Sequence, residues 1–382
     1  MNREPTYQAA RSVSAAVADH FRRHIAAARA QGEEQLAPEP EESTIAAIID
    51  AAFWASLRRE EGLSPKISLA FVPPEEVDQP IVFERPLPLT TNFLIKLAPA
   101  VERPEIHLGV WCQNGELHVW GATRAVPSFC FVLEVVEPGL LVIKHRRIDG
   151  FGKFANVAVL KGEQVKVIDE NGTSLPDCPE LLTKLLAFTS PSGWEGGESV
   201  NVLVQLAASM RAHGHGGLLL VIPAGTEKWR ESIVHPILYS VVPPFTGLTD
   251  LMSQDEEQQT ERLWQAAMRR AVDTVAGLTA VDGATVISDR YELLAFGAKI
   301  RRASGSPQVD DIIITEPIVG NHAEMVHPGQ TGGTRHFSAA QFVFDCRDAI
   351  ALVASVDGRF TIFAWSPCEN MVHAHRVDTL LL

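Results

Sequence analysis

The stretch GGLLLVI, from Gly216 to Ile222, is the part of the sequence that most directly indicates the fold. Two glycines followed by an unbroken apolar run are typical of a strand that is buried on both faces. A helical pattern over 200–212 precedes it, and a long one over about 256–275 follows it. Strands are then expected over 284–288 and 293–296. Helices that alternate with strands predict an α/β domain with a mixed, layered sheet and flanking helices.

The pattern continues toward the carboxyl terminus. A polar stretch rich in glycine and proline over 303–333 leads to a helix over 338–347. Strands follow over 350–355 and 360–365. We therefore expect a domain over 196–370, with residues 371–382 as a terminal strand or tail. A short helix over 179–188 and a glycine-rich boundary over 189–198 should precede this domain.

The amino-terminal part combines helices with a mainly antiparallel sheet. Apolar residues at helical spacing, including Val13, Val17 and Phe21, predict a helix over the first ~30 residues. An acidic, proline-containing linker over 32–42 separates it from a second helix, which Ser43 or Thr44 can cap and Gly62 can end. We expect 1–62 to form a helical domain of its own.

Period-two alternation then predicts a β-rich domain over 63–195. Three hairpins are indicated by the turns Asn114-Gly115, Glu137-Pro138-Gly139 and Lys161-Gly162. Trp111 and Trp120 on the first hairpin are more typical of cross-strand packing than of a ligand-binding surface. The whole chain is thus expected to be mixed α/β and α+β, with the β-hairpin region preceding the layered domain.

Composition excludes several function classes. Lys and Arg number 33 against 47 Asp and Glu, a net charge of −14, which argues against a DNA, RNA or anionic membrane partner. No apolar run approaches the ~18 residues of a membrane span. The polar start of the chain lacks the apolar core of a secretion signal, so we expect a cytoplasmic protein.

Cysteine and histidine spacing gives no metal or disulfide signature. The five cysteines include no C-x-x-C pair, and free thiols that mostly fill the core are expected. The pairs His213/His215 and His373/His375 lack an adjacent acidic or cysteine partner. We do not expect either pair to bind a metal.

The segment Asp282-Gly283-Ala284 is the first candidate for chemistry. It lies between an expected helix and an expected strand, where Gly283 allows a close approach to a ligand. The carboxylate of Asp282 could hold a divalent metal, Mg²⁺ or Mn²⁺, on a polyphosphate. An ordinary Asp-Gly turn is the simpler interpretation.

The second candidate is the run 329–336, GQTGGTRH. Gly333 and Thr334 at a helix start would present backbone N–H groups to an anion, and Arg335 would add a fork of donors that suits phosphate. It is not a Walker loop, because no Gly-Lys-Ser/Thr follows. A helix cap with a solvated Arg335 and a capping His336 is the alternative.

Taken in order, the strand at 216–222, Asp282-Gly283-Ala284 and Gly333-Thr334-Arg335-His336 resemble the diadenylate cyclase domain superfamily over about residues 200–370. In that family two domains meet face to face, each holds one ATP, and the product is cyclic di-AMP. The resemblance implies that Asp282 is metal-associated and that the second motif cradles phosphate. The ligand-binding set it implies is Asp282, Gly283, Ala284, Gly333, Thr334, Arg335, His336 and Ser338.

Two departures favour a sensor over an enzyme. Phe337 stands where the family has a second Arg, and Val356, in Ser355-Val356-Asp357, stands where it has a metal-binding Glu. A slip of one residue would bring Asp357 there, but on the other face of a strand. The long stretch 303–330 is expected to cover the pocket. The chain is most similar to the DACNV-like sensor offshoot, which has a long amino-terminal extension.

The sequence therefore predicts a sensor that binds an adenine nucleotide or cyclic dinucleotide, with Mg²⁺ or Mn²⁺ accompanying it and a homodimer as an expected assembly. An active cyclase is the alternative. It would use Asp282 with one further acid: Asp357, Asp310, Asp311, Glu316 or Glu324. A scaffold that keeps the fold without the pocket is the third hypothesis.

Overall fold

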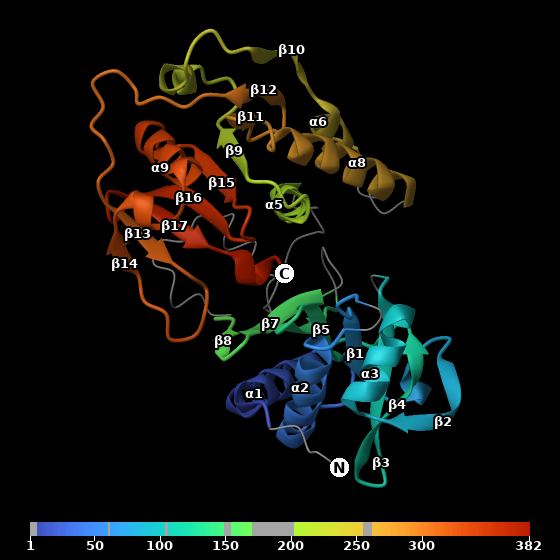
Figure 1. Ribbon diagram of the computed structural model, residues 1–382. Coiled ribbons are helices and arrows are strands. Elements are labelled where there is room, and N and C mark those ends of the chain that lie inside the picture. The colour runs from blue at the N-terminus through green and yellow to red at the C-terminus, as the bar shows by residue number, and fades with distance from the viewer. Residues whose placement is uncertain (1–5, 60–61, 104–105, 149–153, 170–201, 255–261) are drawn as a thin grey trace. The chain divides into compact units, whose positions relative to one another are not determined.

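The computed structural model describes residues 6–59, 62–103, 106–148, 154–169, 202–254 and 262–382. They form two compact units, each with its own sheet (Figure 1). Unit 1 comprises the described residues up to 169, and unit 2 those from 202 to 381. The helix expected over 179–188 and the boundary over 189–198 lie outside the described residues. The mixed α/β class predicted from the sequence is confirmed.

Unit 1 is an eight-stranded sheet in the order β2-β4-β3-β1-β5-β6-β7-β8. Its strands are β1 (Ile67–Phe71), β2 (Ile81–Pro88), β3 (His107–Gln113), β4 (Glu116–Thr123), β5 (Phe131–Glu137), β6 (Leu140–Arg146), β7 (Phe154–Lys161) and β8 (Gln164–Val167). β1 and β3 pair in parallel, and the other neighbours pair antiparallel. All three predicted hairpins are confirmed. Asn114 and Gly115 both have positive φ, as a tight two-residue turn requires.

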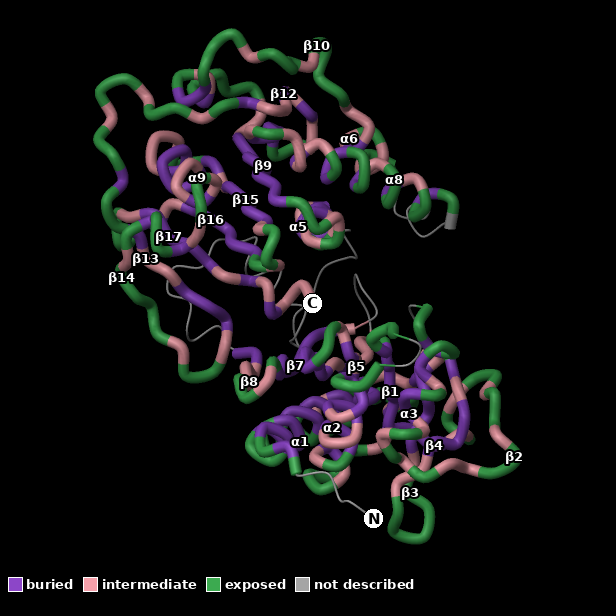
Figure 2. The backbone as a smooth tube through the Cα atoms, viewed as in Figure 1, coloured by how far each residue is buried: buried purple, intermediate pink, exposed green. Residues whose placement is uncertain are grey.

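The helices of unit 1 share one core with this sheet. Val17 and Phe21 of α1 (Gln8–Ala30) and Ile49 of α2 (Glu42–Ser56) are buried in the same cluster as Leu69 and Leu133 of the strands. α3 (Thr91–Leu97) joins this cluster through its Leu94 and Ile95. Figure 2 shows buried positions along α1 and the central strands. The division expected at residue 62 therefore does not separate two cores, because the apolar faces of α1 and α2 are buried by the sheet itself.

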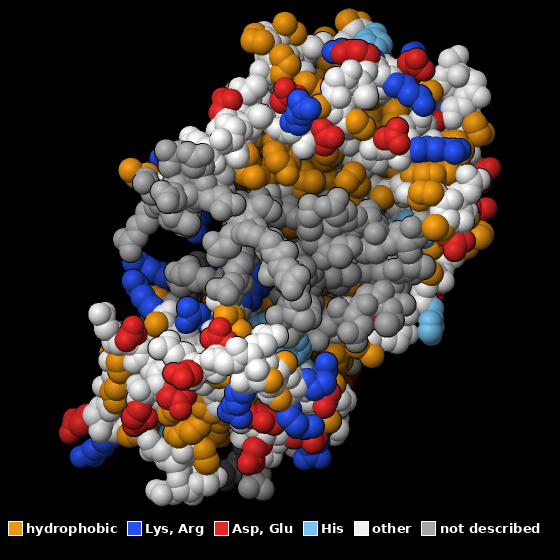
Figure 3. Space-filling model, turned by 180° about the vertical axis from the view of Figure 1, so that it is seen from behind, with side chains coloured by type: hydrophobic (Ala, Val, Ile, Leu, Met, Phe, Trp, Pro, Cys, Tyr) orange, Lys and Arg blue, Asp and Glu red, His pale blue; other side chains and the backbone are white. Residues whose placement is uncertain are grey.

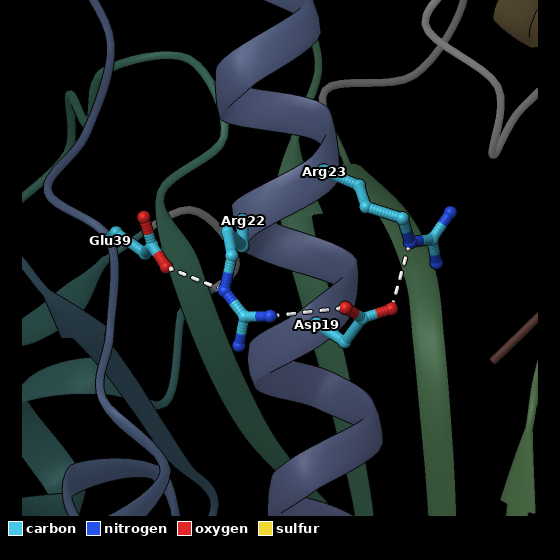
Figure 4. A network of polar contacts seen from close by, with 4 residues as sticks. All are labelled: Asp19, Arg22, Arg23 and Glu39. Atoms are coloured by element: carbon cyan, nitrogen blue, oxygen red, sulfur yellow. Dashed lines mark hydrogen bonds and ion pairs between the residues drawn. The ribbon is translucent and has the colours of Figure 1, made fainter.

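The segment expected to be a linker, 32–42, is attached to the rest of unit 1 near its middle. Leu36 forms a bridge with Ser128, and the Ala37 N–H donates to the Ser128 carbonyl at 2.8 Å. Arg22 of α1 lies between Asp19, at 3.2 Å, and Glu39, at 3.3 Å (Figure 4). These exposed ion pairs contribute little to stability. The segment is held chiefly by its backbone.

The second helix begins earlier than predicted. Glu41, rather than Ser43 or Thr44, is the N-cap residue of α2, and its carbonyl accepts from the Ile45 N–H at 3.0 Å. That bond is the first of the helix, and no side chain of the N-cap residue accepts from the N–H groups before Ile45.

Trp120 is a core residue, as its position on the hairpin predicted. It is 1% exposed, and its Nε1–H donates to the Val72 carbonyl at 2.7 Å. The indole lies so close to β3 that a Cβ on Gly109 would meet it at 2.0 Å. Trp111 packs on Phe71 with ring centroids 4.8 Å apart. Cross-strand packing is therefore confirmed for both tryptophans.

Unit 2 is a nine-stranded sheet in the order β10-β12-β11-β9-β15-β16-β17-β13-β14. Its strands are β9 (Gly217–Ile222), β10 (Tyr239–Phe245), β11 (Ala284–Ser288), β12 (Leu293–Ala298), β13 (Ile312–Thr315), β14 (Glu324–Val326), β15 (Ile350–Ala354), β16 (Phe360–Ser366) and β17 (Met371–Arg376). Its α-helices are α5 (Val202–Ala212), α6 (Gly247–Met252), α8 (Arg262–Leu278) and α9 (Thr334–Asp345).

β9 occupies the centre of this sheet. All six of its residues are buried, and it pairs in parallel with β11 and antiparallel with β15. Leu218 and Leu220 share a core with Phe342 of α9. α5 packs against α8, and these two helices contact β15 and β12 respectively. The double burial predicted from the apolar run is confirmed.

Part of the long stretch 303–333 extends the sheet, and its short turn η4 (Pro328–Gln330) contacts α9. β13 pairs in parallel with β17, and β14 pairs antiparallel with β13. β17 in turn pairs along its whole length with β16, so residues 371–376 are an integral strand. The apolar run Ile312–Ile314 favours this outcome, because its residues are buried or partly buried in the strand beside β17.

The cysteines differ in part from the expected core role. Cys130 is buried and Cys346 is partly buried, but Cys112 and Cys368 are exposed. Cys178 lies outside the described residues. No helix in the described part of the chain is long and apolar enough to cross a membrane. On the face shown in Figure 3, acidic and basic described side chains are interspersed.

Candidate functional site

The sequence-predicted motifs lie together at one end of the central strands of the unit 2 sheet. β9 and β11 run in parallel, and their partners β15 and β12 run in the opposite direction. Gly217 therefore lies opposite Ala354, and Ala284 opposite Ala298, at the same end of the sheet. The residues just beyond these four positions come from four different parts of the chain.

Asp282 projects from this end of the strands because Gly283 packs against the neighbouring strand. Gly283 has φ +127°, and a Cβ on it would lie 2.4 Å from the carbonyl carbon of Gly297. The Asp282 side chain is 92% exposed, and its Oδ2 lies 2.5 Å from Lys299 Nζ. The hydrogen bond from Lys299 and its charge lower the pKa of the Asp282 carboxyl, and the charge of Arg335 adds to this effect.

Lys299 is a site residue that the sequence analysis missed. The signal was present in the hairpin formed by β11 and β12. Because Ala284 lies opposite Ala298, the residue after β12 must lie beside the residues before β11. Hairpin pairing alone thus places Lys299 next to Asp282.

Arg335 lies on the first turn of α9 and reaches the start of β9. It is partly buried, and a Cβ on Gly216 would meet its Nη1 at 2.6 Å. The glycine before the strand therefore makes room for the guanidinium. Leu219 lies opposite Thr285 in the parallel pair, so Gly216 and Asp282, which precede the two strands, lie side by side. Since Arg335 reaches Gly216, the structure brings together the two motifs that the sequence singled out.

The second motif begins the helix rather than preceding it. α9 starts at Thr334, with Gly333 as an N-cap residue that makes no side-chain cap bond, whereas the sequence predicted a start at Ser338. Gly333 and Thr334 are exposed, and Ser338 is partly buried one turn along. Ala284 is fully buried and can offer a ligand only its backbone.

His336 is a core residue, unlike its neighbour Arg335. It is 2% exposed, and its ring folds over Gly332, where a Cβ would lie 2.3 Å from Nδ1. Its Nε2 lies 3.4 Å from Thr361 Oγ1. Burial lowers the pKa of His336 to about 4, so the imidazole is neutral near pH 7. The structure places it beneath the helix, away from the exposed motif residues.

Further charges surround the amino end of α9. The turn between β15 and β16 carries Asp357, whose Oδ2 lies 3.4 Å from Arg359 Nε. Asp357 raises the pKa of His336, and Arg376 and Arg359 lower it, although burial is the largest influence. Val356 is 75% exposed in this turn.

The turn corrects the register argument made from the sequence. Residues 355–359 close on themselves, since the Ser355 N–H donates to the Arg359 carbonyl at 2.9 Å. Neither Val356 nor Asp357 is therefore in a strand, and strand alternation does not decide which of them faces the site. Phe337 lies beside His327, with ring centroids 6.2 Å apart.

The other candidate acids lie along the added strands. Asp310 and Asp311 are exposed before β13, so they are at the opposite end of the sheet from Asp282. Glu316 follows β13 on the side of Arg376, and Glu324 pairs beside Ile314. These two reach the correct end of the sheet, but on strands remote from β9 and β11.

The residues present do not fit a metal held by the protein. Among the described residues, no group of three or more His, Cys, Asp or Glu side chains gathers. Asp282 is engaged by Lys299 and Asp357 by Arg359. His213 uses Nε2 toward Thr279 Oγ1, at 3.3 Å, and Nδ1 toward the His215 N–H, at 3.0 Å.

Comparisons with known proteins find one matching family. Residues 34–124 match the family model described as "Probable sensor domain DACNV". The match lies within unit 1, from the segment after α1 to just past β4, whereas the motifs described above are in unit 2. The predicted similarity to this type of sensor is thus supported in unit 1.

No curated protein matches the chain. Among solved structures, a double-cysteine mutant of DacA from Staphylococcus aureus matches with 13% sequence identity and a TM-score of 0.24. The match covers 45% of this chain and 83% of DacA.

Proposed function

We propose that this protein is a sensor, and that unit 2 binds an adenine nucleotide or a cyclic dinucleotide at one end of the central strands of its sheet. The observation that carries the proposal is the convergence of Asp282, Lys299 and Arg335. They come from three separate segments and meet where β9 and β11 begin and β12 ends. Unit 1, which contains the segment similar to a sensor domain, transmits or receives the signal.

The charged side chains at this end of the strands suit a phosphate group. Arg335 offers a planar fork of donors, and Lys299 offers an ammonium that is 52% exposed. The first turn of α9 adds the positive end of a 12-residue helix. Arg359 is a third cation beside Arg335 and Lys299, so these cations outnumber the two carboxylates, Asp282 and Asp357, at this end of the strands.

Sensing is favoured over turnover by what replaces two family residues. Phosphoryl transfer depends on charge neutralisation and on metal ions positioned at the phosphates. Phe337 provides no cation and Val356 no carboxylate at the positions where the resemblance implies them. Asp357 provides a carboxylate at the same end of the strands, so an active cyclase is the second candidate function.

The binding test uses isothermal titration of the full chain with ATP and with cyclic di-AMP. We expect binding by wild type and a loss of roughly 10- to 100-fold in affinity for Arg335→Ala, the range for a charged hydrogen bond. Arg290→Ala is the matched control, because Arg290 is exposed in the turn after β11, at the opposite end of the sheet. No binding by wild type, or equal affinity in the Arg335 variant, would refute the proposal.

The cyclase alternative is tested by incubating wild type and Asp282→Asn with ATP and Mn²⁺ or Mg²⁺, with the nucleotides separated by chromatography. Cyclic di-AMP formed by wild type and lost in the variant would establish an enzyme. If Arg335→Ala changes stability while neither protein binds a nucleotide, the scaffold hypothesis is favoured.

A further inference from the structure

Lys299 is held in the site by more than its ion pair. The Val234 N–H donates to the Lys299 carbonyl at 2.8 Å, and the next residue, Ile300, forms a bridge with Ile233. These contacts fix the backbone on the carboxyl side of the Lys299 Cα, and the pairing of Ala298 with Ala284 fixes it on the amino side. The ammonium lies 2.5 Å from Asp282 Oδ2 and is still half exposed, so a ligand can contact it directly.

We propose that Asp282 is a positioning residue that holds Lys299 as an anion-binding cation, and that the site binds its phosphate-bearing ligand without a divalent metal ion. This inference rests on the proposed function and specifies its ligand class. It assigns to Asp282 a role opposite to the metal-associated role that the sequence resemblance implies.

The surroundings of Asp282 argue against a metal there. A hard divalent cation takes several oxygen ligands, usually from more than one carboxylate or from waters. Within the described residues no further acid gathers beside Asp282, and Asp357 is engaged by Arg359. A metal on Asp282 would also have to displace the Lys299 ammonium and approach Arg335, both of which repel it.

The same charges indicate the kind of ligand. Lys299, Arg335 and Arg359 exceed Asp282 and Asp357 by one positive charge. Arg376 and Glu316, which end β17 and follow β13 at the same end of the sheet, leave this excess unchanged. That small excess complements phosphodiester groups, which carry one negative charge each, better than a triphosphate. A triphosphate carries more charge than these side chains neutralise without Mg²⁺. We therefore expect cyclic di-AMP to bind in preference to ATP when no metal is present.

The experiment titrates the full chain with cyclic di-AMP and with ATP, in buffer with EDTA and in buffer with Mg²⁺. The expected affinity for cyclic di-AMP differs by less than about two-fold between the buffers. Lys299→Met, which keeps the apolar stem and removes the charge, should weaken binding roughly ten-fold. Lys228→Met is the matched control, since Lys228 is exposed beyond the far end of β9.

A double-mutant cycle tests the positioning role. If Asp282 acts through Lys299, the variant carrying both Asp282→Asn and Lys299→Met binds no more weakly than Lys299→Met alone. If the two losses add in full, Asp282 has a role of its own and the inference is wrong. A general loss of structure would not produce this non-additive pattern together with insensitivity to EDTA.

The remaining outcomes separate this inference from the proposed function. Binding of cyclic di-AMP that requires Mg²⁺ would overturn the inference and leave the proposed function standing. Titration with Mn²⁺ alone gives a readout without nucleotide, and Mn²⁺ binding that is lost in Asp282→Asn would also overturn it. If neither nucleotide binds in either buffer, the proposed function fails and the inference fails with it.

Discussion

Acidification is expected to destabilise unit 2 through the buried imidazole of His336. The ring is 2% exposed, and burial lowers its pKa from 6.5 to about 4. Burial is the largest cause of that shift, which also includes the opposing effect of Asp357 and the lowering effects of Arg376 and Arg359. The unfolded chain therefore takes up a proton at pH values where the folded chain does not. Stability is unaffected above about pH 6.5 and falls as the pH drops from about 6.5 toward 4.

The size of the effect follows from the two pKa values. With 6.5 in the unfolded chain and about 4 in the folded one, His336 costs about 2 kcal/mol at about pH 5. The cost reaches about 3 kcal/mol once the pH is below the folded value. That is a substantial part of the free energy of unfolding of an ordinary domain.

The assay is urea unfolding of wild type and His336→Gln at about pH 8 and about pH 5. The transition that reports unit 2 is the one whose midpoint the substitution shifts at the higher pH. Other groups titrate equally in both proteins, so the difference between them isolates His336. His322→Gln, at an exposed histidine of the same unit, should behave as wild type. If His336→Gln loses as much stability as wild type between the two pH values, the imidazole is not held neutral and the reasoning is wrong.

Two further outcomes are expected from the packing. Gly332→Ala should cost roughly 1–3 kcal/mol in urea unfolding, because the new Cβ would lie 2.3 Å from His336 Nδ1. Gly333→Ala has open space and should cost about 1 kcal/mol or less, and equal costs would contradict this account of His336. In the folded protein, peptide mapping after iodoacetamide treatment should find Cys112 alkylated and Cys130 unmodified, because burial raises the pKa of the Cys130 thiol. Rapid modification of Cys130 would contradict its burial just before β5.

Local signals predicted much of the fold. The turn Asn114-Gly115 and the apolar run of β9 both lie where the sequence placed them. β10 was missed because Pro243 and Pro244 remove two backbone donors. The strand is tolerated because it is the edge strand and because both prolines fall between Ser240 and Phe245, where its register with β12 shifts.

The candidate site was predicted only in part. Asp282 and Arg335 were identified from the types of residue, but their proximity depends on the pairing of β9 with β11 and the packing of α9, which no local pattern contains. The burial of His336 had a signal. It shares a helical face with Ala339, Ala340 and Val343, all of them buried. The composition of the motif drew attention to its chemistry, whereas its periodicity indicated the core.

The central position of β9 has a consequence during synthesis of the chain. Its partner β15 lies roughly 130 residues later in the sequence, so the middle of the sheet cannot close until the ribosome has passed Ala354. Until then the leucines of β9 are exposed and its backbone groups on the β15 side are unpaired, which favours aggregation. Unit 1 differs, because its ladders from β5 to β8 join neighbours as they emerge. We therefore expect the chain to need chaperone protection chiefly while its second half is being translated.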